Sequence, residues 1–276
     1  MANYKVVDAD LLDSDLNGLA LIIRAKTGST EKILFPTGFY AAVDEMFETG
    51  KQSGYTDGHT AGLAEGKQAE NISLMTAIQQ GGAKTNYAST FQSSYWTDDN
   101  FKPIFDMNVT GGTAMFKDSA ITDLKGILER RGVTLDTSNC GNVYELMSGS
   151  KITHSPAISC LGVTVITQSF YGCRDLISLK LILKADGTNT FSTPFAYCES
   201  LVDLVVEGVI GAKDFNLRWS TKLSRASIES VINALSTTTT GLSVTLSKTA
   251  VQKAFATEAE WNDFIAIRPN WTINLS

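Results

Sequence analysis

Apolar residues in the N-terminal stretch recur with the spacing of a helix. Within residues 10–26 every third or fourth position is apolar, which predicts one helix with a single apolar face: Leu12, Leu16, Leu19 and Ile23. Residues 32–35 read as a short strand, and a second helix is expected after Pro36. Because this helix–strand–helix unit, residues 1–48, is small, we expect it to dock on another part of an assembly.

Glycines dominate the next segment at a fixed spacing. They occupy every fourth position over seventeen residues: Gly50, Gly54, Gly58, Gly62 and Gly66. In a helix each would cost about 1 kcal/mol relative to alanine. Close approach of a second helix would offset this cost, as in small-xxx-small packing. Residues 49–84 are therefore interpreted either as a helical stalk that packs in a homo-oligomer or as a flexible linker.

A repeated pattern begins in the second half of the chain. Phe170-x-x-Cys173-x-x-Leu176 and Phe195-x-x-Cys198-x-x-Leu201 align at an offset of 195 − 170 = 25 residues, within the roughly 20–29 residue range of leucine-rich repeats. Weaker copies begin earlier and later, with other residues at the cysteine position: Met115 with Asp118, Leu146 with Gly149, and Leu217 with Ser220. A unit of this length cannot bury its own apolar residues, so successive units must stack.

These repeats are expected to have covered ends. Residues 86–109 are rich in aromatic residues and are interpreted either as a capping layer over the first repeat or as a platform for carbohydrate. After the repeats, Ser224 is expected to cap a helix over residues 225–235. A strand at 242–246, helices at 249–255 and 258–267 and a strand at 271–275 complete a C-terminal cap. The expected fold is α+β: an N-terminal helical anchor and stalk, a solenoid over residues 85–224, and an α/β cap over residues 225–276.

Composition narrows the possible partners. The chain is 43% hydrophobic and 19% charged, which is typical of a globular protein, and its formal charge of −6 disfavours binding to nucleic acid. The longest apolar run, residues 19–23, is too short to span a bilayer, and we expect no membrane insertion. The first ten residues lack the pattern of a signal peptide. The four cysteines form no C-x-x-C pair and are expected to stay reduced after synthesis in a cytoplasm.

The sequence offers little that indicates catalysis. The only two histidines, His59 and His154, lie outside any nucleophile motif, and no phosphate-binding glycine pattern is present. The acidic pair Asp98 and Asp99 lacks the spacing of a calcium loop, so no metal site is predicted. We therefore expect no enzyme and no cofactor.

Two parts of the chain resemble known families. The clear repeats resemble BspA-like leucine-rich repeats, whose units carry Phe-x-x-Cys-x-x-Leu before a strand; the matching residues are Phe170, Cys173, Leu176, Phe195, Cys198 and Leu201. The front end, Ile23-Arg-Ala-Lys-Thr-Gly28 with Phe35-Pro-Thr-Gly-Phe39, resembles the N-terminal segment of tail-associated structural proteins of phages and prophages.

This resemblance implies a non-enzymatic virion protein, either of the tail (fibre or baseplate) or of the head (fibre or decoration). Residues 1–84 would contact other virion proteins and form a homo-oligomer, a trimer by analogy with fibrous virion proteins. The repeats would recognise a host-surface glycan or protein. A bacterial BspA-like surface adhesin is the first alternative, and a glycan-cleaving tail enzyme is the second.

Overall fold

The computed structural model describes residues 71–276, so the predicted unit 1–48 and the five-glycine segment lie outside the described residues. Residues 69–276 form one compact unit. Within it, residues 71–79 are helical and are followed by the 3₁₀ helix η1 (Gln80–Gly82). The other helices are α3 (Leu124–Arg131), α4 (Arg225–Ala234), α5 (Lys248–Ala254) and α6 (Glu258–Ile265).

The strands are short and all of their pairings are parallel. They are β1 (Met107–Asn108), β2 (Leu135–Asp136), β3 (Ile158–Ser159), β4 (Val165–Thr167), β5 (Ser178–Ile182), β6 (Thr190–Ser192), β7 (Asp203–Glu207), β8 (Asn216–Leu217), β9 (Leu242–Leu246) and β10 (Trp271–Leu275). The described part of the chain is therefore a mixture of helices and parallel strands, as the α+β expectation requires.

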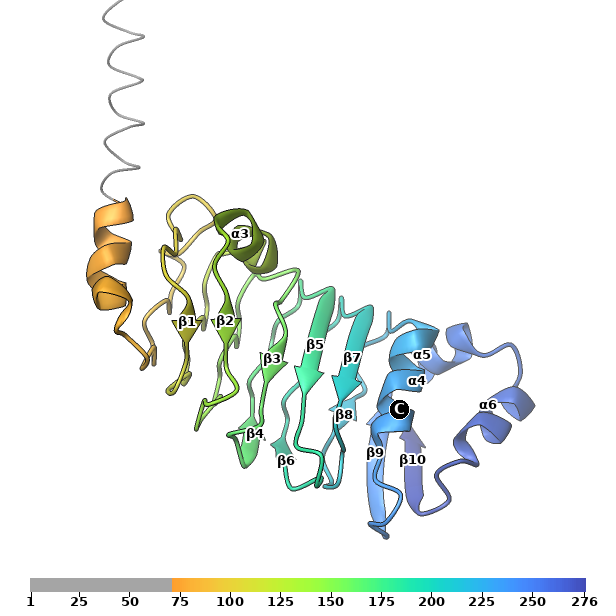
Figure 1. Cartoon of the computed structure of the whole chain (residues 1–276). Coiled ribbons are helices and arrows are strands. Elements are labelled where there is room, and N and C mark those ends of the chain that lie inside the picture. The colour runs from red at the N-terminus through yellow and green to blue at the C-terminus, as the bar shows by residue number, and fades with distance from the viewer. Residues whose placement is uncertain (1–70) are drawn as a thin grey trace, which may run out of the picture. The chain divides into compact units, whose positions relative to one another are not determined.

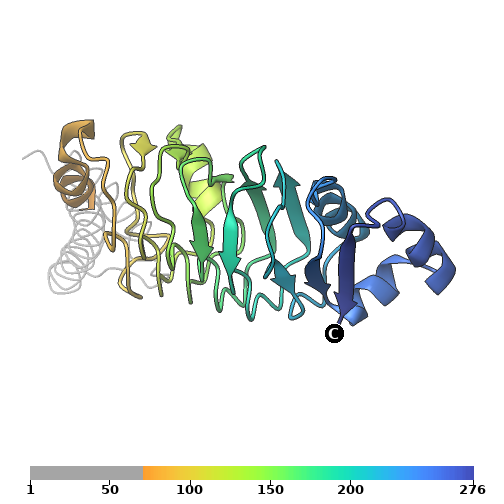
Figure 2. The ribbon, with the colours of Figure 1, turned by 90° about the horizontal axis from the view of Figure 1, so that it is seen from below.

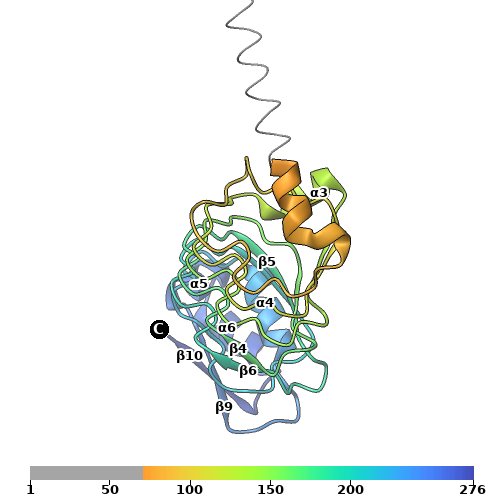
Figure 3. The ribbon, with the colours of Figure 1, turned by 90° about the vertical axis from the view of Figure 1, so that its left-hand side faces the viewer.

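Between paired strands the register advances by 23 to 29 residues. Ser178 of β5 pairs with Asp203 of β7, and Val165 of β4 pairs with Thr190 of β6, so that 203 − 178 = 25 and 190 − 165 = 25. The sheets run in the orders β3-β5-β7, β4-β6, β1-β2 and β10-β9-β8. Each turn of the chain thus lies beside the next, as Figure 1 and, from below, Figure 2 show. Viewed along the row of strands, the turns overlay one another around the buried interior (Figure 3).

The backbone repeats more regularly than the sequence. Left-handed residues recur in pairs four residues apart, namely Ser89 and Ser93, Ala114 and Asp118, Glu145 and Gly149, Gln168 and Gly172, and Thr193 and Tyr197. Midway between the residues of the first four pairs, one backbone N–H donates to the next turn: Phe91 to the Met115 carbonyl, Phe116 to Leu146, Met147 to Ser169, and Phe170 to Pro194. These positions define five equivalent turns.

This register corrects two of the weaker repeat copies by one residue. The residues equivalent to Phe170 and Cys173 are Phe116 with Ser119 and Met147 with Ser150, whereas the sequence pattern selected Met115 with Asp118 and Leu146 with Gly149. The next apolar position was assigned correctly, because Thr153 N–H donates to the Thr122 carbonyl and Ile177 N–H to the Thr153 carbonyl, which keeps Ile121 and Ile152 in line with Leu176. The earlier turns have one residue fewer between the cysteine-equivalent position and this apolar position. A template without gaps therefore matches the apolar position but misplaces the two positions before it by one residue.

The aromatic segment forms a turn of its own rather than only a layer over one. Tyr87 N–H donates to the Gly111 carbonyl at 2.9 Å, and Thr97 forms a parallel bridge with Ala120. The residues before it provide the cover: Met75 of the helix 71–79 is fully buried, and the Gln79 amide bonds both the carbonyl of Phe105 and the N–H of Ile104 at 2.9 Å. Residues 71–84, which the sequence assigned to a helical stalk or linker, therefore pack as part of the unit 69–276.

Helix α4 ends the sheet β3-β5-β7 by covering the edge of β7. The hydroxyl oxygens of Ser227 and Ser230 accept hydrogen bonds from the N–H groups of Leu204 and Val206, at 2.8 and 2.9 Å. These side chains replace a further strand, so the edge groups are satisfied. The open edge of a parallel stack is thus closed by a helix.

The cap elements form close to where the sequence predicts them. Ser224, Ser247 and Thr257 each accept a hydrogen bond from a backbone N–H three residues on, which fixes the starts of α4, α5 and α6. Helix α3 was not predicted, although Asp123 caps it and Gly132 ends it in a left-handed conformation. None of the helices within residues 71–276 is both long and apolar enough to cross a bilayer.

Candidate functional site

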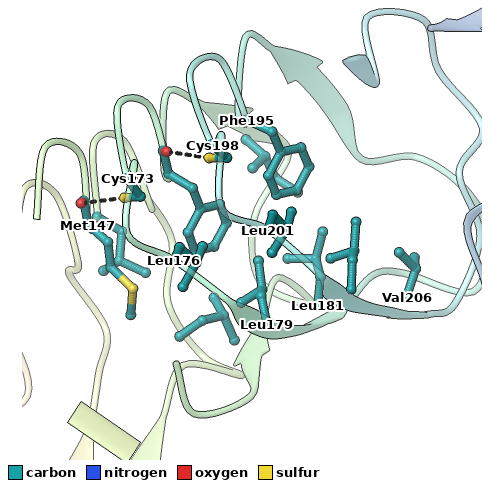
Figure 4. Packing of buried hydrophobic residues seen from close by; sticks show 14 of the residues in the cluster. Met147, Cys173, Leu176, Leu179, Leu181, Phe195, Cys198, Leu201 and Val206 are labelled. Carbon is teal, nitrogen blue, oxygen red and sulfur yellow. Dashed lines mark hydrogen bonds between the residues drawn. The ribbon is translucent and has the colours of Figure 1, made fainter. Parts of the chain in front are cut away.

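The residues that carry the repeat pattern lie in the interior. All six are at most 1% exposed: Phe170, Cys173, Leu176, Phe195, Cys198 and Leu201. The rings of Phe170 and Phe195 stack with centroids 5.5 Å apart and planes 4° apart. The thiol of Cys173 donates to the Met147 carbonyl at 2.9 Å, and that of Cys198 donates to the Phe170 carbonyl at 3.0 Å (Figure 4). These side chains join adjacent turns and do not reach solvent.

Burial also makes the thiols unreactive. Desolvation raises the pKa of Cys160 and of Cys173 from 9.0 to about 12, and it raises the pKa of Cys140 and Cys198 as well. A thiol with a raised pKa carries very little thiolate, the reactive form, near neutral pH. The four cysteines are free and all are buried, which fits a packing role.

We therefore predict slow labelling of the folded protein by a thiol-reactive disulfide reagent. At pH 8 Cys160 and Cys173 should react on the order of a hundredfold or more slowly than in denaturant, because so little thiolate forms in the folded state. Cys140 and Cys198, whose pKa burial also raises, should react more slowly as well. The folded-state pKa of Cys173, about 12, lies above the ordinary 9.0, so its burial stabilises the fold below pH 9 and this contribution declines as the pH rises toward 12. A thiol that reacts at its denatured rate would contradict this assignment.

The histidine and acidic candidates have structural surroundings. His154 Nδ1 lies 2.9 Å from the hydroxyl of Thr153 at the surface, and His59 lies outside the described residues. The Asp98 carboxylate accepts hydrogen bonds from the N–H groups of Thr122 and Asp123 and so connects two turns. Across residues 71–276 no group of three histidine, cysteine or acidic side chains is placed to hold a metal ion.

The carbohydrate platform, one of the two interpretations of residues 86–109, is contradicted for most of its aromatic residues. Tyr87, Phe91, Trp96 and Phe101 are buried. Phe91 is stacked on Phe116 with centroids 5.4 Å apart, so its faces are used in packing. These rings fill the first turns and cannot stack on a sugar.

A different aromatic row lies on the outer side of the later turns. It consists of Tyr171, Tyr197 and Trp219, from three successive turns, none of which is buried. The Tyr171 and Tyr197 centroids are 5.4 Å apart, and those of Tyr197 and Trp219 are 4.9 Å apart. The guanidinium carbon of Arg218 lies 3.6 Å from the centroid of the Trp219 ring. We call the three rings the aromatic row.

A shallow groove of about 550 Å³ runs beside the end of this row. It is lined by residues of three successive turns, namely Arg174, Asp175, Glu199, Ser200, Arg218, Trp219, Thr221 and Lys222. Asp175 forms an ion pair with Lys151 at 3.3 Å, and the Lys222 ammonium lies 3.4 Å from the Ser200 hydroxyl. The groove thus combines an aromatic edge with charged and hydroxyl groups, the combination that binds polar ligands with ring or carbon faces.

A cleft of similar size, about 590 Å³, lies between α5, α6 and β10. Its aromatic residues Phe255 and Trp261 are 5% and 6% exposed and pack against each other with centroids 5.0 Å apart. They offer little ring surface to a ligand, so the groove beside Trp219 is the stronger candidate.

The sequence pattern did not reveal this site. Tyr171 follows Phe170 by one residue, while Tyr197 and Trp219 follow Phe195 and Leu217 by two, so all three occupy variable positions of the repeat. A search of those variable positions for aromatic residues would have found them. Comparison with known proteins adds no further assignment, because no family model matches the chain, and no curated protein or solved structure matches it.

Proposed function

We propose that this chain is a non-enzymatic virion protein of a phage whose stacked turns form a BspA-like leucine-rich-repeat solenoid and recognise a host-surface glycan or protein. The parallel register near 25 residues and the inward positions of Phe170 and Phe195 support a repeat solenoid. The resemblance of the front end to phage tail-associated proteins supports the virion setting. Residues 1–84 would form the contacts with other virion proteins and with further copies of the chain.

The observation that carries recognition is the aromatic row next to the groove. Exposed aromatic rings supply large, rigid contact area at small entropic cost, and saccharide rings present carbon faces that pack on them. Tyr171, Tyr197 and Trp219 support one another through ring contacts from turn to turn. A row that spans three turns suits an extended ligand such as a surface polymer.

The described chemistry favours binding over cleavage. A nucleophilic cysteine needs a depressed pKa, and here burial raises the pKa of every thiol in the chain. The groove is shallow, and its carboxyl groups share it with three cations. Glycan-cleaving enzymes instead place a pair of carboxyl groups on either side of the scissile bond.

An array of bacterial surface glycans, probed with the full chain, tests this function. We expect binding to a subset of the array, and Trp219→Ala should weaken it roughly 5- to 150-fold, since loss of an aromatic side chain that stacks on a nucleic-acid base costs about 1–3 kcal/mol. Ile267→Ala, which truncates an exposed apolar side chain outside the groove, is the control and should bind as the parent does. A chain that binds no glycan and no intact host cell would refute recognition.

The virion setting is tested separately. Phage particles should be prepared from bacteria whose genome or prophage encodes the chain. An antibody raised against the chain should label these particles, and the label should lie at a tail or head structure. Label confined to the cell envelope would favour the adhesin instead.

A further inference from the structure

Arg218 is held in an unusual way for an exposed arginine. Its guanidinium carbon lies 3.6 Å from the Trp219 ring centroid, which is a stacked arrangement over the ring. Trp219 is in turn supported by Tyr197 at 4.9 Å, and Tyr197 by Tyr171 at 5.4 Å. The aromatic row therefore fixes the plane of one guanidinium.

Stacking uses the face of the guanidinium and leaves its edge available. The N–H donors of arginine lie in the plane of the group, so a ring below that plane takes none of them. In residues 71–276 no carboxylate lies within 4.0 Å of the Arg218 side chain, and its only hydrogen bond is that of its backbone N–H to Asn216. A preoriented fork of donors that faces a groove is suited to a planar carboxylate or to two oxygens of a phosphate.

The other charges of the groove are consistent with an anionic ligand. Three cations line it, Arg174, Arg218 and Lys222, against the two acids Asp175 and Glu199. Asp175 is already paired with Lys151, which adds a further positive charge beside the groove. The local excess is positive although the chain carries a formal charge of −6, so the groove would attract anions that the rest of the surface repels.

We propose that the groove is an anion subsite in which Arg218, held flat by Trp219, binds a carboxylate or phosphate group carried by a saccharide or polyol polymer. Lys222 and Arg174 flank the same anionic group, and the ligand's carbon face packs against the edge of Trp219. This inference rests on the proposed function, since it names the chemical class that the recognition surface takes.

Three probes separate the sources of the anion: an oligogalacturonate (carboxylate), a poly(glycerol phosphate) oligomer (phosphate) and a maltooligosaccharide (neutral). Titration of the full chain at low salt should show binding of one or both anionic probes at least tenfold tighter than the neutral one, and high salt should weaken it. Arg218→Gln should weaken anionic binding at least tenfold. Arg218→Lys should recover only part of it, because an ammonium lacks the planar fork.

Lys253→Gln on α5 removes the same charge away from the groove and is the control, which should bind as the parent does. Trp219→Phe keeps a ring under Arg218 and should retain more affinity than Trp219→Leu. Thermal unfolding of each variant separates loss of binding from loss of fold. Equal binding of all three probes, or Arg218→Gln with parent affinity, would overturn the anion subsite and leave recognition intact. If no probe, glycan or host cell binds the parent chain, the proposed function itself fails.

Discussion

Replacement of Phe195 by alanine will lower the free energy of unfolding by about 3–5 kcal/mol, the usual cost of removing a fully buried phenylalanine. Phe195 is 0% exposed and stacks on Phe170 of the preceding turn at 5.5 Å. It also contacts Phe215 of the next turn, with centroids 5.3 Å apart. Its loss leaves a cavity between three turns, and neither neighbour can move to fill it without leaving its own hydrogen-bonded register.

Denaturant unfolding monitored by circular dichroism measures this change. Val205→Ala on the neighbouring strand β7 is the control: Val205 is 47% exposed, so its truncation should cost less than about 1 kcal/mol. The loss of unfolding free energy for Phe195→Leu should lie between those of the two alanine variants, because leucine retains part of the buried volume. If Phe195→Ala were no more costly than Val205→Ala, the interior position of this ring would be wrong.

The C-terminal cap could be predicted from the sequence because local signals determine its elements. Ser224, Ser247 and Thr257 each stand directly before a segment that carries apolar residues at helical spacing, and each caps a helix in the structure. The strands β9 and β10 alternate apolar and polar residues over five positions in the sequence and were placed correctly. No knowledge of distant contacts is needed for such features.

The repeat register could not be predicted fully, because it depends on pairing between turns. Between the cysteine-equivalent position and the next apolar residue there are three steps in one turn, from Cys173 to Leu176, and two in an earlier one, from Ser150 to Ile152. A sequence template of fixed spacing therefore aligns the apolar position correctly but misaligns the cysteine-equivalent position. The backbone hydrogen bonds from turn to turn resolve the ambiguity, and they exist only in three dimensions.

The candidate site was missed for a related reason. Aromatic residues are most concentrated in residues 86–109, but the chain folds those rings into the first turns and exposes only a few. The row that faces solvent has one aromatic residue per turn, so its density in the sequence is low. Side by side in space, these rings form a surface that no short window of sequence contains.

Close backbone contact between turns leads to a second large effect, at Gly208. This residue follows β7 with a φ of +91°, and a Cβ there would overlap the Leu183 carbonyl group, with its carbon only 2.7 Å away. The obstacle is backbone of the adjacent turn, which cannot rotate aside as a side chain would. An alanine must therefore separate the two turns as well as adopt a left-handed conformation.

We expect Gly208→Ala to lower the free energy of unfolding by roughly 2–5 kcal/mol, as the sum of conformational strain and overpacking. Gly241→Ala isolates the first of these: its φ is +74°, yet a Cβ there meets nothing within 4 Å. That variant should cost only about 1–2 kcal/mol. The difference between the two variants in denaturant unfolding therefore measures how tightly adjacent turns are held together. Equal costs would mean that the turn after β7 can move away from Leu183 freely, and that the stack is looser than its hydrogen bonds indicate.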